Sequence, residues 1–277
     1  MLRFICAFLL LLTSTVVQAE SVFTLGVLPI HSSRVLVERY EPMRSYLEKR
    51  LKHPVRIETA PEFERFNARM LKGDFDLTIT PSHMARVAQL DNGFVPLVQF
   101  YPEHDALLIY NVDKPIQLPQ GLQTLKGGKV AVIDPMAITV MAVLNYLDEN
   151  GLESDRDYKV ETYHTHAGVA HALMSGLVDA AVTTSQGMMQ IPADLRRKIM
   201  VYRHIADIPA FIFVAKPRVS SERAAELRAI MLQFGKEEEG LEFYGRTGYL
   251  GVRATTDASM KRVDAYLKQT RKMLGIR

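Results

Sequence analysis

The sequence has a single cysteine and no tryptophan among its 277 residues, and its charges of the two signs nearly balance. The one cysteine, Cys6, lies in an apolar run near the start, so the chain beyond that run has no thiol for disulfides, metal ligation or nucleophilic catalysis. The 34 Lys and Arg against 31 Asp and Glu give a net charge of +3 without a basic cluster. A nucleic-acid-binding surface is therefore excluded, and we expect no nucleic-acid partner.

The first residues have the pattern of a secretory signal. Arg3 precedes an apolar run over residues 4–12, and small side chains stand at Val17 and Ala19. This arrangement predicts a signal peptide over residues 1–19, cleaved after Ala19. The run is too short for a membrane anchor, which needs about 20 apolar residues. Since a chain without disulfides suits a bacterial periplasm, we expect a soluble periplasmic protein.

Beyond the signal, short β-rich runs alternate with segments of helical periodicity. Strands are predicted at residues 22–27, 55–59, 77–80, 94–100, 129–133, 160–163, 180–183, 200–203 and 211–215. Helices are predicted at about 33–51, 62–71, from 81 onward, 138–150, 166–174, 221–234 and 259–274. Ser32 or Ser33 is a suitable N-cap for the first helix, and Pro42 is expected to kink or divide it.

This alternation predicts an α/β fold with mostly parallel, doubly wound sheets. Two such sets are joined near residues 101–106. We expect lobe 1 at residues 20–103, with 217–277 returning to it, and lobe 2 at 104–216. Parallel sheets bind ligands where their strands end and helices begin, so a hinged cleft between the lobes is the expected binding site.

The sequence contains none of the catalytic motifs that would identify an enzyme, since it lacks a nucleophile elbow, a phosphate-binding loop and a paired-histidine metal helix. His164, His166 and His171 raise the question of a metal site, because imidazole binds transition metals. However, His171 would face partly away from His166 on a helix, and no carboxylate lies in the segment. We expect no metal and no cofactor.

The placement of the histidines is informative. His31, His83, His104, His164 and His166 all fall at predicted strand ends or at the crossover. They predict a cleft that donates hydrogen bonds and carries positive charge below a pH of about 6.5. Such a cleft favours an anion or a polar oxygenated ligand. Surface positions in loops are the alternative for each of them.

Several segments resemble one family, the periplasmic substrate-binding proteins of phosphate, phosphite and phosphonate ABC transporters. The segments are Gly26-Val27-Leu28-Pro29, Arg39-Tyr40-Glu41-Pro42-Met43, Ala60-Pro61-Glu62-Phe63, Gly73-Asp74-Phe75-Asp76-Leu77, Thr80-Pro81, Leu125-Lys126-Gly127, Asp134-Pro135 and His166 to Asp179. The resemblance implies a type II periplasmic-binding-protein fold, with two lobes on a hinge and delivery of the ligand to a membrane permease.

Only some of the functional residues of that family have a counterpart in this sequence. Its ligand histidine matches His166, whereas its Ser-Thr-Ser-Gly cluster falls on Ala137-Ile138-Thr139-Val140 and keeps only the hydroxyl of Thr139. Two binding tyrosines become Phe63 and His104, and the acidic residue expected after Ile208-Pro209 is not in its place, unless Asp207 substitutes for it. The loss of hydroxyl donors predicts that simple phosphonates are not bound tightly. An apolar part of a ligand could instead face Ile138, Met136 and Phe63, unless Ile138 and Met136 belong to the core.

We therefore expect a solute-binding protein that takes a small oxyanion or phosphonate-like ligand. The expected ligand-binding residues are His31, Ser32, Phe63, Thr80, Ser82, His83, His104, Thr139, His166 and Thr183. The hydroxyls and imidazoles would donate to ligand oxygens, helped by the N–H groups at helix N-termini. We expect the protein to be a monomer. The alternatives are a periplasmic sensor that docks on a membrane signalling protein such as a sensor kinase and, third, an enzyme on the same scaffold.

Overall fold

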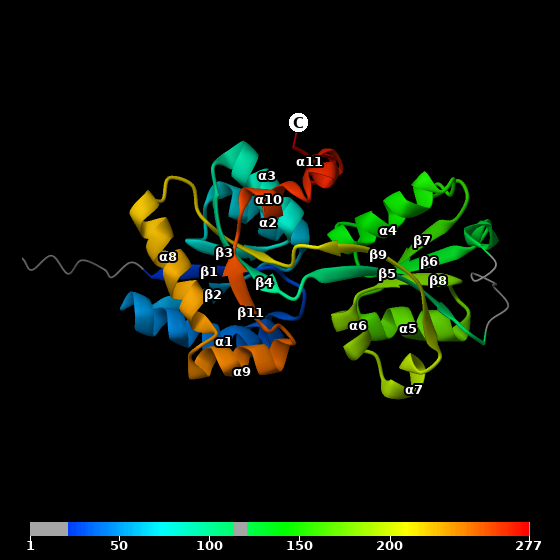
Figure 1. Cartoon of the computed structure of the whole chain (residues 1–277), viewed down its shortest axis with the longest axis horizontal. Helices are drawn as coiled ribbons and strands as arrows, with labels where there is room; N and C mark the ends of the chain where they lie inside the picture. The colour runs from blue at the N-terminus through cyan, green and yellow to red at the C-terminus, as the bar shows by residue number, and fades with distance from the viewer. Residues whose placement is uncertain (1–21, 114–120, 277) are drawn as a thin grey trace, which may run out of the picture.

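The computed structural model describes residues 22–113 and 121–276 and contains two β-sheets flanked by helices (Figure 1). The predicted signal peptide and its cleavage point lie outside the described residues. The first sheet, which defines lobe 1, has the strand order β11-β4-β10-β3-β1-β2. Its strands are β1 (Phe23–Val27), β2 (Val55–Glu58), β3 (Leu77–Thr80), β4 (Val95–Tyr101), β10 (Ile212–Ala215) and β11 (Gly251–Ala254).

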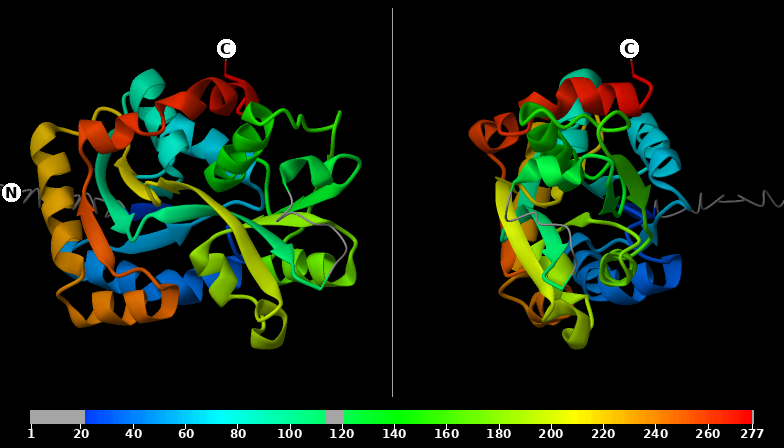
Figure 2. Two further views of the ribbon diagram at one scale, coloured as in Figure 1. Left: turned by 45° about the vertical axis from the view of Figure 1, so that its right-hand side comes forward. Right: turned by 90° about the vertical axis from the view of Figure 1, so that its right-hand side faces the viewer.

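The second sheet defines lobe 2 and has the order β7-β6-β8-β5-β9. Its strands are β5 (His104–Asn111), β6 (Lys129–Val132), β7 (Lys159–Thr162), β8 (Ala180–Thr183) and β9 (Ile199–Ile208). The chain passes between the sheets twice, from β4 to β5 and from β9 to β10. These two connections lie side by side between the lobes in Figures 1 and 2. The α/β fold with two lobes is confirmed.

The prediction of mostly parallel sheets is wrong in part, because both sheets are mixed. β1 is parallel to β2 and β3, but β10 is antiparallel to β3 and β4, and β11 is antiparallel to β4. In lobe 2, β6 is parallel to β7 and β8, but β5 is antiparallel to β8 and β9. The reversals of β5 and β10 have a simple cause, since both strands enter their sheets from the other lobe and run opposite to their neighbours β8 and β3.

Helices cover both faces of each sheet. Those of lobe 1 are α1 (Ser33–Leu51), α2 (Phe63–Lys72), α3 (Ser82–Asn92), α8 (Ser221–Phe234) and α9 (Glu238–Thr247). Those of lobe 2 are α4 (Ile138–Glu149), α5 (His166–Ser175), α6 (Ser185–Met189), α7 (Ala193–Arg196) and the 3-10 turn η2 (Leu122–Leu125). No helix in the described part of the chain is both long and apolar enough to cross a membrane.

Side chains alternate between two buried clusters on the faces of each sheet, as the pleat requires. On β10, Phe213 packs with the helices α1, α8 and α9, whereas Val214 packs on the opposite face with α2 and α3. On β6 of lobe 2, Val130 faces the α4 side and Ala131 the α5 side. Each lobe is therefore a three-layer unit with its own core.

The first helix is not divided at Pro42, contrary to one of the two expectations for it. Residues Ser33–Leu51 form one helix with Pro42 buried in its interior. Proline cannot donate to the carbonyl four positions earlier. That carbonyl, of Glu38, accepts a hydrogen bond of 3.0 Å from the Arg246 guanidinium instead. A residue from α9 thus satisfies the acceptor that the proline leaves free.

The C-terminal segment contacts both lobes. The single helix predicted at 259–274 is instead α10 (Asp257–Lys261), the 3-10 turn η3 (Asp264–Tyr266) and α11 (Leu267–Met273). Met260 is buried in lobe 1, but Val263 belongs to the lobe 2 cluster and Tyr266 packs against it. Arg271 then binds Asp91 on α3 of lobe 1. The breaks let the segment reach across to α4 and back (Figure 2).

Candidate ligand-binding site

Three polar side chains at the junction of β3 and α3 are buried, and each has an atom without a hydrogen-bond partner among the described residues. Thr80 ends β3, Pro81 caps α3, and Ser82 and His83 form its first turn. All three polar side chains are at most 1% exposed. Thr80 Oγ1, Ser82 Oγ and His83 Nδ1 have no partner among the described residues. Buried polar atoms are nearly always paired in folded proteins, so this cluster stands out.

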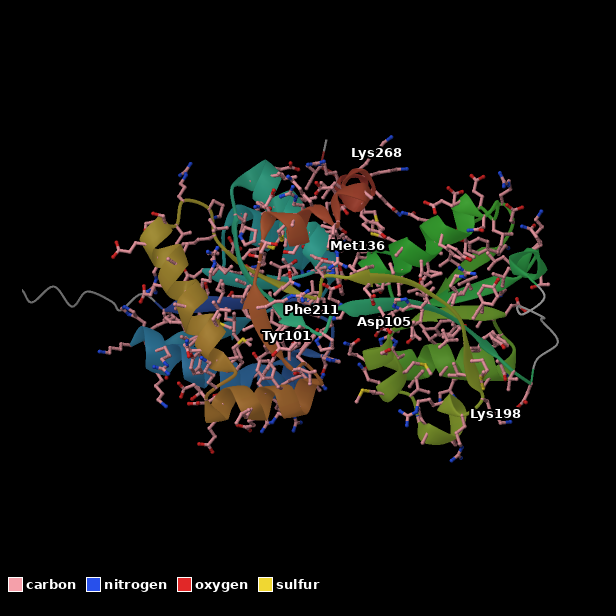
Figure 3. The ribbon with its side chains drawn as sticks, in the orientation of Figure 1. Tyr101, Asp105, Met136, Lys198, Phe211 and Lys268 are labelled. Atoms are coloured by element: carbon pink, nitrogen blue, oxygen red, sulfur yellow. The ribbon has the colours of Figure 1, made fainter. Side chains whose placement is uncertain are left out.

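The other nitrogen of His83 connects the two lobes. His83 Nε2 lies 3.1 Å from the backbone carbonyl oxygen of Met136 in the β6–α4 loop of lobe 2. A carbonyl only accepts, so Nε2 carries the hydrogen. Figure 3 shows Met136 on the side of lobe 2 that faces lobe 1. The β3–α3 junction is therefore at the contact between the lobes.

Lobe 2 adds Thr139, which is nearly buried in the first turn of α4. Ala137 is the N-cap of that helix and forms no side-chain cap. Ile138 is 4% exposed and packs in the core of lobe 2. The expectation that Ile138 lines the ligand is therefore wrong, because its side chain points into the core. Phe63 is half-buried and packs against the lobe 1 core, which leaves part of its ring accessible.

His166 begins α5 and is held by two contacts within lobe 2. Its Nδ1 and Thr183 Oγ1 form a hydrogen bond of 2.9 Å. The ring lies against Gly187, where a Cβ would come within 2.2 Å of ring Cε1. Thr183 is 2% exposed at the end of β8. The strand end, the helix start and the glycine thus fix the ring in place.

His31, in the loop after β1, approaches His166 from lobe 1. Burial, and after it the nearby His31, lower the pKa of His166 to about 4. Arg39 donates from Nη1 to His31 Nε2 at 2.9 Å, so a neutral His31 ring carries its proton on Nδ1 and can donate it. Ser32 is exposed and makes no side-chain cap on α1. Ser32 is thus the one exposed side chain among the expected ligand-binding residues, all of which lie in the described part of the chain.

His104 packs where the chain passes between the two lobes. Its Nε2 lies 3.0 Å from the Tyr249 hydroxyl, and its ring packs edge-on against Phe211 at a centroid distance of 5.0 Å. Phe211 lies in the second connection between the lobes, and Figure 3 labels it there. His104 is the first residue of β5, directly after the first connection, and it therefore packs against the second.

For His31, His83, His104 and His166, the expectation of a positive charge below a pH of about 6.5 is wrong. Burial lowers the pKa of His83 and that of His104, each to about 4. Burial, and then the Arg39 charge, also lower the pKa of His31. An imidazole taken out of water disfavours its charged form. At neutral pH these three rings and that of His166 act as neutral hydrogen-bonding groups.

The cation near the site is instead Arg39, which the sequence analysis missed. Arg39 has no carboxylate partner within residues 22–113 and 121–276, unlike Arg34 on the same helix, which pairs with Glu38. Arg39 also lines a shallow hollow of about 320 Å³ with Val35, Glu38 and Arg246. Arg39 lies in the second turn of α1. Side chains on a helix point back toward its N-terminus, so the Arg39 guanidinium can reach His31 in the loop before the helix.

The predicted ligand-binding residues do not line the following cavity of lobe 2. A cavity of about 520 Å³ in lobe 2 is lined by Asn111, Asp113, Met174, Asp194, Leu195, Arg197 and Lys198. In the part of the chain that the structure describes, no three His, Cys, Asp or Glu side chains are grouped to hold a metal ion. His164 and His171 are both exposed.

Comparison with solved structures supports the fold. XAC2383 from Xanthomonas citri, bound to chloride ion, has a TM-score of 0.78 and 17% identity, covering 91% of this chain and 99% of that one. PhnD1 from Prochlorococcus marinus, in complex with methylphosphonate, has a TM-score of 0.75 and 15% identity, covering 92% and 98%. The aliphatic sulphonate binding protein SsuA from Escherichia coli has a TM-score of 0.60 and 17% identity, covering 90% and 92%.

No curated protein matches the sequence. The family described as "ABC transporter, phosphonate, periplasmic substrate-binding protein" matches it over residues 25–260, from β1 to α10. The match includes both sheets, both connections and all the polar residues of the site described above. The chain belongs to the phosphonate family of periplasmic substrate-binding proteins of ABC transporters.

Proposed function

We propose that this protein captures a small oxyanion between its lobes and delivers it to the membrane permease of an ABC transporter. The observation that carries the proposal is the set of buried, unpartnered atoms Thr80 Oγ1, Ser82 Oγ and His83 Nδ1 at the contact between the lobes. A buried polar atom without a partner costs about 1–3 kcal/mol. An oxyanion bound there would restore those hydrogen bonds.

Two helix N-termini support the same ligand class. α3 begins at Ser82 and α4 at Ile138, and their first-turn N–H groups have no partner within the helix. Such N–H groups and the helix dipole favour an anion. Because His83 contacts Met136, the two helix ends meet at the contact between the lobes. An oxyanion could thus contact both lobes and favour their closure.

Arg39 would balance the charge of the ligand, and His31 would form the hydrogen bond between Arg39 and the ligand. The guanidinium holds His31 Nε2, which leaves the Nδ1 hydrogen free to donate toward the ligand. His31 in turn lies close to His166 on the opposite lobe. We propose these three residues, with Thr139 and Thr183, as the second part of the binding site, and the accessible part of Phe63 as its apolar edge.

Methylphosphonate is the ligand of the Prochlorococcus relative, and its fold is shared here, as is that of a sulphonate-binding protein. Only Thr139 keeps a hydroxyl in the loop that holds phosphonate oxygens in the family. We therefore propose that simple phosphonates bind weakly here, because the hydroxyl donors that hold phosphonate oxygens in the family are largely absent.

A thermal-shift screen of phosphorus, sulfur, selenium and arsenic oxyanions tests the proposal. An anion at about 100 times its Kd should raise the unfolding midpoint by roughly 5–10 °C. The Thr80→Val, Ser82→Ala double variant should lose that rise, whereas Ser33→Ala, at an exposed position on α1, should keep it. The proposal is wrong if no oxyanion raises the midpoint of the native protein.

A further inference from the structure

His83 presents a hydrogen-bond acceptor, although imidazoles were expected to act as donors in this site. Its Nε2 hydrogen points to the Met136 carbonyl oxygen at 3.1 Å. A neutral imidazole has one N–H, so Nδ1 has a bare lone pair. That nitrogen is buried and has no partner among the described residues.

The surroundings keep this ring neutral. His83 is 1% exposed, and no carboxylate of the described residues lies within ion-pair distance of it. The nearest charge on its own helix is the buried Arg86 guanidinium, which is bound by Asp264. Asp134, next to the Met136 loop, accepts from the Met136 N–H. Among residues 22–113 and 121–276, no carboxylate contacts the ring to stabilise a second ring proton.

We propose that His83 selects oxyanions that keep a hydrogen on one oxygen, such as hydrogen phosphate, over fully deprotonated ones such as sulfate. This inference rests on the proposed function, because it assigns a ligand class to the same site. The hydroxyl of the ligand donates to His83 Nδ1, and its remaining oxygens accept from Thr80, Ser82 and the first N–H groups of α3.

The choice of a protonated oxyanion follows from the mixture of groups at the β3–α3 junction. Two hydroxyls and a helix N-terminus favour acceptor oxygens, whereas one adjacent nitrogen requires a donor. Hydrogen phosphate offers both on one tetrahedral group. Sulfate has the same shape and the same charge of −2 but no hydrogen, so a lone pair would face the lone pair of Nδ1.

Isothermal titration with phosphate and sulfate tests this at about pH 8, where phosphate is mainly the dianion. Because the two ions match in shape and charge, their difference reports the single hydrogen. We expect phosphate to bind at least about tenfold more tightly than sulfate, since a buried acceptor left unpaired costs that much or more.

Two variants separate the acceptor from the interlobe hydrogen bond. In His83→Asn, the amide oxygen can take the place of Nδ1, but the side chain no longer reaches Met136. In His83→Gln, the amide can reach Met136, but no acceptor remains at the Nδ1 position. We expect Asn to keep the preference for phosphate and Gln to reduce it to less than about threefold. Thermal unfolding of both variants verifies that they fold.

The outcomes are distinct for the two proposals. Equal binding of phosphate and sulfate by the native protein, or tighter binding of sulfate, overturns the role of His83 and leaves oxyanion capture intact. A preference that survives in His83→Gln also overturns it. If neither ion binds and no other oxyanion does, both proposals are wrong.

Discussion

The Nε2 atom of His83 and the carbonyl oxygen of Met136 lie 3.1 Å apart, and the hydrogen bond between them joins the two lobes. It connects the start of α3 with the loop before α4, the two helix ends proposed to face the ligand. Movement of the lobes apart would break this bond and open the buried hydroxyls of Thr80 and Ser82 to water. Ligand capture and lobe closure are in this way linked through one side chain.

Arg39 should determine the affinity for anions. Arg39→Gln removes the guanidinium that holds His31 Nε2 and should weaken binding of a dianion about tenfold or more, because hydrogen bonds to charged groups contribute about 1.5–3 kcal/mol. Arg34→Gln is the matched control on the same helix, since Arg34 is exposed and pairs only with Glu38. Titration calorimetry of both variants checks this, and equal affinities would remove Arg39 from the site.

Gly187 should be needed for the position of the His166 ring. A methyl group at residue 187 would lie 2.2 Å from ring Cε1, so Gly187→Ala must push the ring away from Thr183. We expect weaker anion binding by about tenfold, from loss of one aligned donor. Gly245→Ala on α9 has free space around it and should leave binding unchanged. Unchanged affinity in Gly187→Ala would show that His166 does not touch the ligand.

The start of α4 offers two adjacent substitutions with opposite results. Ala137→Ser introduces a hydroxyl at an N-cap that has none, and should raise the free energy of unfolding by about 1 kcal/mol and tighten methylphosphonate binding. Ile138→Thr puts a hydroxyl in the lobe 2 core and should lower that free energy by about 1–3 kcal/mol. Urea unfolding and calorimetry measure both. A Ser variant without either gain would contradict the placement of Ala137.

Anion affinity should not change between pH 7.5 and 5.5. A bound anion favours the charged form of an imidazole, so affinity increases only as the pH falls toward the histidine pKa. The pKa of His166 is lowered to about 4 and that of His31 is also lowered, so tightening should begin below about pH 5. Methanesulfonate does not titrate in this range and isolates the protein groups. Marked tightening between pH 7.5 and 6.5 would contradict the neutral state of these rings.

The sequence was sufficient to predict the elements that form the site. Hydrophobic periodicity and Thr80-Pro81 placed the end of β3 and the start of α3, where Ser82 and His83 lie. The turn at Thr165-His166 likewise gave the start of α5. These are local properties of the chain, so spacing and capping residues are enough to find them.

Interactions between distant residues could not be predicted. The continuous α1 depends on Arg246, 204 positions after Pro42, and the broken C-terminal helix depends on contacts with α4. The mixed sheets depend on where the chain returns from the other lobe. The neutral histidines depend on burial, which periodicity does not show. Each depends on the tertiary arrangement of the chain.

A crystal structure of the protein with hydrogen phosphate tests the central claim most directly. The account predicts an anion between the lobes, with oxygens at hydrogen-bonding distance from Ser82 Oγ and Thr139 Oγ1 and its hydroxyl toward His83 Nδ1. An anion bound elsewhere, such as the hollow beside Arg246, with Thr80 and Ser82 still unpartnered, would contradict it.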